Sequence, residues 1–183
     1  MGISRPGDMR LLCDIAKPTM GIITNIGAAH LEFLGNMQGV ADEKTVLFEA
    51  LPPNGITIIN QDDPYLSPWK DTRLGHDTLS EKWTYAIVND ADLIATEIVS
   101  NRNGIAFTLA LNRNQKGGGG KMKVGLSLLG EHQVYNALAA SAGALALGYE
   151  FDEIRSALQD ISPMALRGEI IEWNGATIFL DAY

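Results

Sequence analysis

The chain has 183 residues, of which 46% are hydrophobic and 20% are charged, a composition typical of a soluble globular protein and unlike that of a disordered chain. Acidic residues outnumber basic ones by 22 to 14, and the net charge of −8 disfavours non-specific binding to nucleic acid or an anionic membrane. No apolar run is long enough to span a membrane, and a single cysteine, Cys13, cannot form an internal disulfide. We therefore expect a soluble, cytoplasmic α/β protein with neither nucleic-acid nor membrane partners.

The first third of the chain alternates between helical and strand patterns. Apolar residues at helical spacing predict a short helix that starts at Asp8 and ends before Pro18. The apolar runs 20–25 and 56–60 are typical of buried parallel strands, and the apolar stripe from 37 to 51 predicts a helix between them. This order predicts a parallel βαβ unit, after which Asp62 is predicted to cap a further helix.

The pattern changes after Trp83. Three strands, at 92–100, 104–111 and 121–128, are expected to form a small antiparallel meander within an antiparallel subregion at 90–129. The glycine run 117–120 is interpreted as a hairpin tip without a function, because no helix pattern follows it.

The last quarter of the chain predicts two helices and a hairpin. The helices are expected at 134–147 and 151–158, and the hairpin strands at 169–173 and 177–180 around Asn174-Gly175. The chain stops directly after this last strand, which we interpret as truncation. The fold class expected overall is a mostly parallel sheet flanked by helices, with the meander added to it.

Lys44 is the only polar residue on the apolar face of the helix at 37–51, a face formed by positions 37, 40, 41, 44, 47, 48 and 51. Burial there would lower the lysine pKa well below its usual value of about 10.4. A neutral amine is a nucleophile, and it can also react with carbon dioxide to give a carbamate that binds metal ions. Alternatively, the lysine stem packs against the core while its amine reaches water.

His30 lies just beyond the strand that ends at Asn25, where site residues of parallel sheets gather. Its imidazole could bind a metal ion or orient a phosphate, and Glu32 could assist it; alternatively, both side chains are simply solvated. The combination of His30 with Lys44, fourteen residues later, is a stronger indication of a site than either residue alone.

Three more groups could bind a nucleotide. His132, Gln133 and Asn136 offer an imidazole and two amides at the start of a helix, which suits a purine edge; a capped core helix is the alternative. Arg167, expected in the turn before the last hairpin, could pair with phosphate, and Asp181 could accept hydrogen bonds from ribose hydroxyls, although each could equally be a surface charge. The chain contains no G-x-x-x-x-G-K-[ST] phosphate loop and no Cys/His cluster for zinc.

Taken in order, these runs resemble the ATP-dependent Mur ligases, and in particular the members that join D-alanyl-D-alanine to UDP-N-acetylmuramoyl-tripeptide. The resemblance covers nearly the whole chain and rests on Pro6-Gly7-Asp8, Ala29-His30-Leu31-Glu32, Gly39-Val40-Ala41 with Lys44, Asn60 with Asp62-Asp63-Pro64, Gly130 with His132 and Tyr135-Asn136-Ala137, and Leu180-Asp181-Ala182-Tyr183.

The resemblance implies ATP and magnesium as cofactors and assigns a role to each candidate residue. Lys44 matches a carbamylated lysine that positions magnesium, and His30 matches a magnesium ligand. His132 and Asn136 match residues around the adenine, Arg167 matches an arginine near the phosphates, and Asp181 matches a ribose-binding aspartate. Gln133 stands where the family usually has asparagine.

The resemblance also implies that the chain, 1–183, is part of a central ATPase domain. The family's phosphate loop and metal-binding glutamate would precede Met1, and its N-terminal UDP-substrate domain and C-terminal domain are absent from the chain. We therefore expect a monomer that is inactive, or nearly so, on its own. Two alternatives stay open: another amide ligase of the superfamily (MurE-like, or like cyanophycin or folylpolyglutamate synthetase), and a non-catalytic module that binds a nucleotide or a partner.

Overall fold

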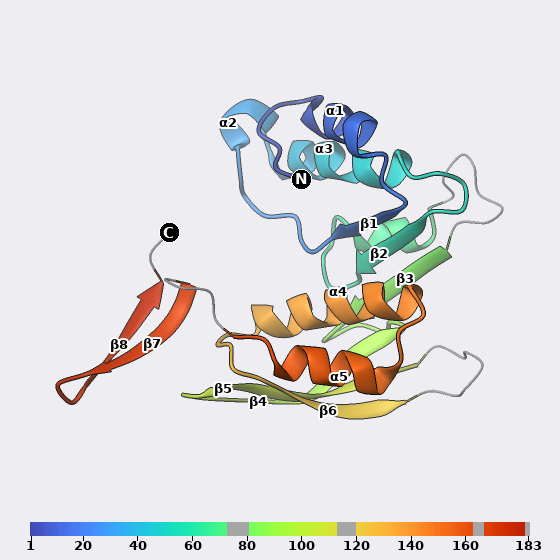
Figure 1. Ribbon diagram of the computed structural model, residues 1–183. Coiled ribbons are helices and arrows are strands. Elements are labelled where there is room, and N and C mark those ends of the chain that lie inside the picture. Colours follow the sequence, from blue (N-terminus) through green and yellow to red (C-terminus); the bar gives the residue numbers. More distant parts are fainter. Residues whose placement is uncertain (73–80, 113–119, 163–166, 182–183) are drawn as a thin grey trace.

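The computed structural model describes residues 1–72, 81–112, 120–162 and 167–181. Its centre is a six-stranded sheet in the order β1-β2-β3-β4-β5-β6, with helices on both faces (Figure 1). The strands are β1 (Met20–Ile23), β2 (Ile56–Asn60), β3 (Glu81–Ala86), β4 (Leu93–Asn101), β5 (Gly104–Leu111) and β6 (Lys121–Leu126). The expected α/β fold class is confirmed.

The parallel part of the sheet contains one strand more than predicted. β1 pairs with β2 and β2 with β3, all in parallel. The sequence analysis placed the change of pattern directly after Trp83, but Trp83 is fully buried within β3, and the antiparallel strands begin only at β4. This strand begins with the charged residues Glu81 and Lys82 and continues with Trp83 and Tyr85, so it lacks the aliphatic run that marks β1 and β2.

The predicted meander of β4, β5 and β6 is antiparallel, as expected. It also continues the parallel strands, since Tyr85 and Ala86 of β3 pair in parallel with Leu93 and Ile94 of β4. The glycine run lies outside the described residues except for Gly120.

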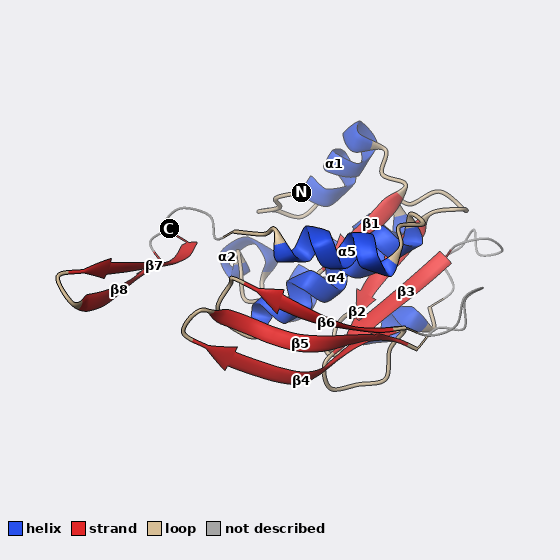
Figure 2. Cartoon of the chain, turned by 60° about the horizontal axis from the view of Figure 1, so that its bottom comes forward, coloured by secondary structure: helices blue, strands red, loops and turns tan. Residues whose placement is uncertain are grey.

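Helices cover the sheet from both sides. α1 (Asp8–Ala16) and α3 (Met37–Glu49) lie on one face, and α4 (His132–Ala146) and α5 (Phe151–Gln159) on the other (Figures 1 and 2). Because successive side chains of a strand point to opposite faces, Ile58 packs in the core with α4 while Ile59 packs in the core with α1 and α3. No helix in the described ranges combines the length and apolar character that a membrane crossing requires.

Two short helices, α2 (Leu31–Leu34) and the 3-10 helix η1 (Ser67–Lys70), lie in the connections that follow β1 and β2. In α1, the apolar residue Ile15 is 73% exposed, and the helix buries Met9 and Cys13.

The predicted hairpin is formed by β7 (Arg167–Trp173) and β8 (Ala176–Asp181), with Asn174 and Gly175 in the left-handed conformation at its turn. It is a separate two-stranded sheet that lies apart from the six-stranded one (Figures 1 and 2). Arg167 is not in the preceding turn, as predicted, but in β7, where it pairs opposite Asp181.

A buried carboxylate that the sequence patterns did not indicate joins α1 to α3. Glu43 is only 8% exposed, and its Oε1 and Oε2 accept hydrogen bonds from the backbone N–H groups of Met9 (2.7 Å) and Gly7 (2.9 Å). The N-cap residue of α1 is Gly7, which has no side chain, so Glu43 satisfies N–H groups that a helix start leaves without partners.

We expect Glu43→Gln to lower the free energy of unfolding by about 1–3 kcal/mol, because one amide N–H would face a backbone N–H with no acceptor between them. Urea unfolding checks this. Glu49→Gln is the matched control, since Glu49 is on the same helix and, within the described part of the chain, its side chain forms an exposed ion pair with Arg10. Equal stability of the two variants would contradict the role of Glu43.

Candidate functional site

The candidate site lies where β1, β2 and β3 end and α4 begins. Because the three strands are parallel, the loops that follow them meet at one edge of the sheet, which is the usual position of ligand sites in such folds. We call this the carboxyl edge; its residues are 24–26, 60–63 and 87–89, together with the first turn of α4.

The loop after β1 is fixed by side chains from β2 and β3. The Asn60 amide donates to the carbonyl of Thr24 (2.9 Å), and the Tyr85 hydroxyl donates to the same carbonyl (3.3 Å). Asp63, which is buried, accepts a hydrogen bond from the backbone N–H of Ile26 (2.6 Å). Burial, followed by the nearby Asp63 carboxylate, raises the pKa of Tyr85, so its hydroxyl remains a donor.

Asp62 does not cap a helix, so that prediction is wrong: η1 begins only at Ser67. Its carboxylate instead accepts hydrogen bonds from the backbone N–H groups of Ile87 (2.6 Å), Val88 (3.0 Å) and Asn89 (2.9 Å). The Asn89 side-chain amide and the Tyr135 hydroxyl also donate to it, each at 2.9 Å. Burial alone would raise the pKa of Asp62, but these hydrogen bonds outweigh it and the pKa is lowered.

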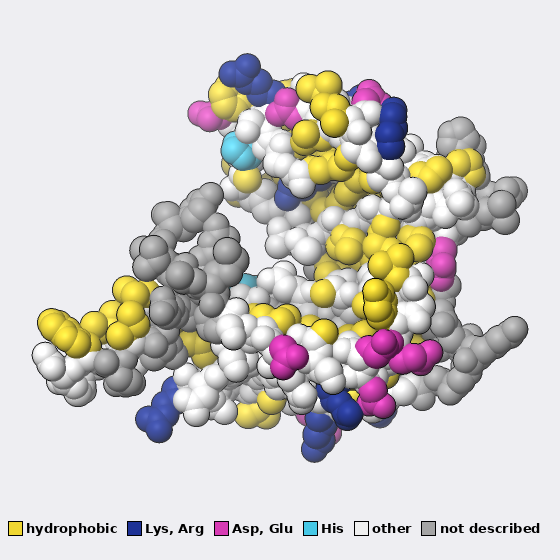
Figure 3. Space-filling model, viewed as in Figure 1, with side chains coloured by type: hydrophobic (Ala, Val, Ile, Leu, Met, Phe, Trp, Pro, Cys, Tyr) yellow, Lys and Arg dark blue, Asp and Glu magenta, His cyan; other side chains and the backbone are white. Residues whose placement is uncertain are grey.

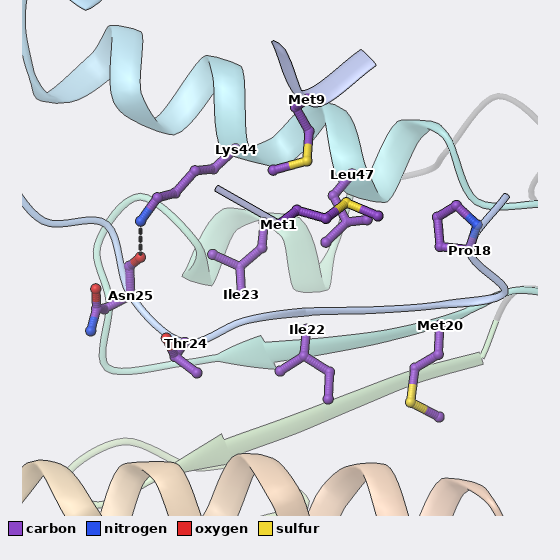
Figure 4. A pocket seen from close by; sticks show the side chains of 10 residues that line it. All are labelled: Met1, Met9, Pro18, Met20, Ile22, Ile23, Thr24, Asn25, Lys44 and Leu47. Atoms are coloured by element: carbon purple, nitrogen blue, oxygen red, sulfur yellow. Dashed lines mark hydrogen bonds between the residues drawn. The ribbon is translucent and has the colours of Figure 1, made fainter. Parts of the chain in front are cut away.

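Lys44 reaches from α3 to the carboxyl edge, where its Nζ donates to the carbonyl of Asn25 at 3.1 Å (Figure 4). The amine borders a cleft of about 340 Å³ beside β1. The cleft is lined by Met1, Met9, Pro18, Met20, Ile22, Ile23, Thr24, Asn25, Lys44 and Leu47. Apolar side chains gather on the face of the molecule between α1 and α4 (Figure 3).

The predicted apolar face around Lys44 is confirmed, because Val40, Ala41, Leu47 and Phe48 are all buried. Burial lowers the pKa of the lysine and the Asp63 carboxylate opposes this, with a net lowering. The predicted direction of this shift is therefore confirmed. The head of the side chain is neither fully buried nor directed away from the protein, since it bonds to a backbone carbonyl.

His30 is exposed and in the left-handed conformation (φ 55°) directly before α2. It is not among the residues that line the Lys44 cleft, and Glu32 is exposed in the first turn of α2. Within the described ranges, no three His, Cys, Asp or Glu side chains come together in a way that could hold a metal ion. A shared metal at His30 and Lys44 stays a prediction.

The three residues predicted to meet a purine lie together at the start of α4. The Gln133 Nε2 atom is 3.1 Å from the His132 Nε2 atom, and the Asn136 amide donates to Gln133 Oε1 at 3.2 Å. The His132 ring packs directly on Gly130 (φ 95°), where an added Cβ would lie 2.6 Å from the ring. Their contact with a purine base stays a prediction. The N-cap residue, Glu131, makes no side-chain cap to this helix start.

Arg167 and Asp181 are not part of the carboxyl edge itself. They pair in register at the base of the hairpin, which lies on the side of the molecule where α4 begins (Figure 1). Their assignments to phosphate and ribose stay predictions.

The sequence analysis assigned no role in the site to four residues whose side chains bind its loops, namely Asn60, Asp63, Tyr85 and Tyr135. The adjacent acids Asp62 and Asp63 at the end of a buried strand were the one available signal.

The family model described as "Mur ligase middle domain" matches residues 1–144. UDP-N-acetylmuramoyl-tripeptide–D-alanyl-D-alanine ligase from Buchnera aphidicola is 30% identical over 184 residues, which cover 100% of this chain and 38% of that protein. The enzyme of the same name from Escherichia coli K12 is 31% identical over 162 residues, covering 88% of this chain and 34% of that protein.

Solved structures agree. A crystal structure of MurF from Acinetobacter baumannii superposes with a TM-score of 0.86 at 27% identity, covering 100% of this chain and 38% of that one. MurF from Thermotoga maritima, solved in complex with ADP, has the same fold with a TM-score of 0.80 at 23% identity, covering 98% of this chain and 39% of that one. The chain thus spans little more than a third of the length of these relatives. With its middle-domain match over residues 1–144, the chain belongs to the Mur ligase family.

Proposed function

We propose that this chain is the central part of an ATP-dependent ligase that joins D-alanyl-D-alanine to UDP-N-acetylmuramoyl-tripeptide, a cytoplasmic step in the synthesis of peptidoglycan precursors. The observation that carries the proposal is that two parts of the site meet at one edge of the sheet. Lys44 binds the loop after β1, and the helix that carries His132, Gln133 and Asn136 is bound to Asp62 of the same edge through Tyr135. The names of the relatives supply the substrates.

In this proposal the start of α4 binds the base of ATP. The amides of Gln133 and Asn136 offer both donors and acceptors, and the His132 ring packs against Gly130. N–H groups at the start of a helix also favour a negatively charged ligand. Arg167 and Asp181 would contact the phosphates and the ribose.

Amide formation in this proposal proceeds through an acyl phosphate. ATP phosphorylates the tripeptide carboxylate, and the amine of D-alanyl-D-alanine then displaces phosphate. Magnesium, when bound, would neutralise the charge that moves with the phosphoryl group. In this reaction the chain would hold the nucleotide and position Lys44. The lowered pKa of Lys44 favours the neutral amine that carbamate formation requires.

The sharpest test of function is a hybrid enzyme in which this chain replaces the matching region of the Escherichia coli relative. We expect the hybrid to form the amide product and Lys44→Met to reduce its rate by at least about a hundredfold, the usual cost of removing a group that stabilises transferred charge. Lys123→Met, at an exposed position of β6, is the matched control. A Lys44→Met hybrid as active as the control would contradict the catalytic assignment.

The isolated chain should bind Mg-ATP only weakly, with a dissociation constant of roughly millimolar, and should release no phosphate with the two substrates. The reason is that it has no phosphate-loop motif, and losing half of a micromolar binding free energy leaves millimolar affinity. Isothermal titration and a phosphate-release assay check this. Tight saturable binding or turnover by the chain alone would refute it.

The contact between the His132 ring and Gly130 gives a prediction with a closely matched control. Gly130→Ala should weaken Mg-ADP binding further, because the new methyl group displaces the His132 ring. Gly148→Ala, at the other end of α4, introduces a side chain at a similar positive φ but into open space. Titration of each variant with Mg-ADP, followed by NMR, compares the two affinities. Equal affinities would show that the contact between the His132 ring and Gly130 does not matter for binding.

A further inference from the structure

Asp62 joins three parts of the carboxyl edge through one carboxylate. From the described residues it accepts five hydrogen bonds, of which four come from residues 87–89 and one from the Tyr135 hydroxyl of α4. Removing the Tyr135 hydroxyl would therefore leave the carboxylate well supplied with donors and would detach only the helix.

The first turn of α4 has little else to fix its position through polar contacts. Glu131 provides no side-chain cap, and the side-chain hydrogen bonds of His132, Gln133 and Asn136 recorded in the described residues run among themselves. Val134 is fully buried and holds the helix to the core, but apolar contacts are not directional. The bond from Tyr135 to Asp62 is directional and, because its acceptor is ionised, stronger than a neutral one.

The protonation states of Tyr135 and Asp62 at neutral pH favour this hydrogen bond. Burial, followed by the hydrogen bond to Asp62, raises the pKa of Tyr135 to about 12, while the pKa of Asp62 is lowered. At neutral pH the phenol therefore keeps its proton and the carboxylate keeps its charge.

We propose that Tyr135 is a positioning residue: its hydroxyl, bound to Asp62, sets the place of the His132–Gln133–Asn136 row over the carboxyl edge. Tyr135 does not touch the nucleotide in this proposal but acts through the helix that carries the row. The relevance to catalysis rests on the proposed function, whereas the tether itself does not.

The test compares Tyr135→Phe with Tyr149→Phe in the 183-residue chain. Tyr149 is 54% exposed beyond the end of α4, so its change is chemically identical but removes no such bond. Two NMR signals report on the row: amide exchange of residues 133–137, and the side-chain resonances of His132, Gln133 and Asn136. We expect Tyr135→Phe to speed exchange about fivefold in this turn and to shift these resonances, because one hydrogen bond to a helix start is lost.

Urea unfolding and an Mg-ADP titration complete the experiment. A loss of global stability that speeds exchange equally throughout α4 and α5 would overturn the proposal, as would exchange and resonances in Tyr135→Phe that match those of Tyr149→Phe. Changes confined to the first turn of α4 would support it. A wild-type chain in which millimolar Mg-ADP perturbs none of the three side chains would refute the proposed nucleotide site while leaving the tether established.

Discussion

Two adjacent carboxylates at the end of β2 hold the carboxyl edge together, and the rest of the site depends on them. Asp63 binds the loop after β1, whereas Asp62 binds the loop after β3 and the start of α4. The two carboxylates bind different segments, so together they reach the loops on both sides of β2. An ionised carboxylate accepts several N–H groups at once, which suits loops whose backbone would otherwise lack partners.

The position of Lys44 follows from this constraint. Its acceptor is the carbonyl of Asn25, and the residues on either side are both fixed: Thr24 by Asn60 and Tyr85, and Ile26 by Asp63. The amine is thus directed at a defined point of the edge by a loop that has little freedom to move. Glu43, one residue before Lys44, fixes the other side of the same helix to the start of α1.

Sequence patterns predicted the parts of the fold that depend on burial. β2 and the apolar face of α3 follow from runs of apolar residues, and the hairpin turn follows from Asn174-Gly175. The roles of Glu43, Asp62 and Tyr135 could not be predicted in this way. Each depends on which backbone N–H or carboxylate of a distant segment lies opposite, and periodicity within one element carries no information about that. β3 was missed because it begins with charged residues and is buried through its aromatic ones.

The account can be tested most directly by titrating the Asp62 carboxylate by NMR. We predict a pKa below the usual 3.8, with the amide resonances of residues 87–89 moving in step as the carboxylate is protonated. Because the pKa is lowered by folding, the stabilisation from Asp62 should be complete above the unfolded-state pKa and lost as the pH falls through the folded-state pKa. A pKa at or above 3.8, or protonation that leaves the amides of residues 87–89 unchanged, would contradict the central role given to this carboxylate.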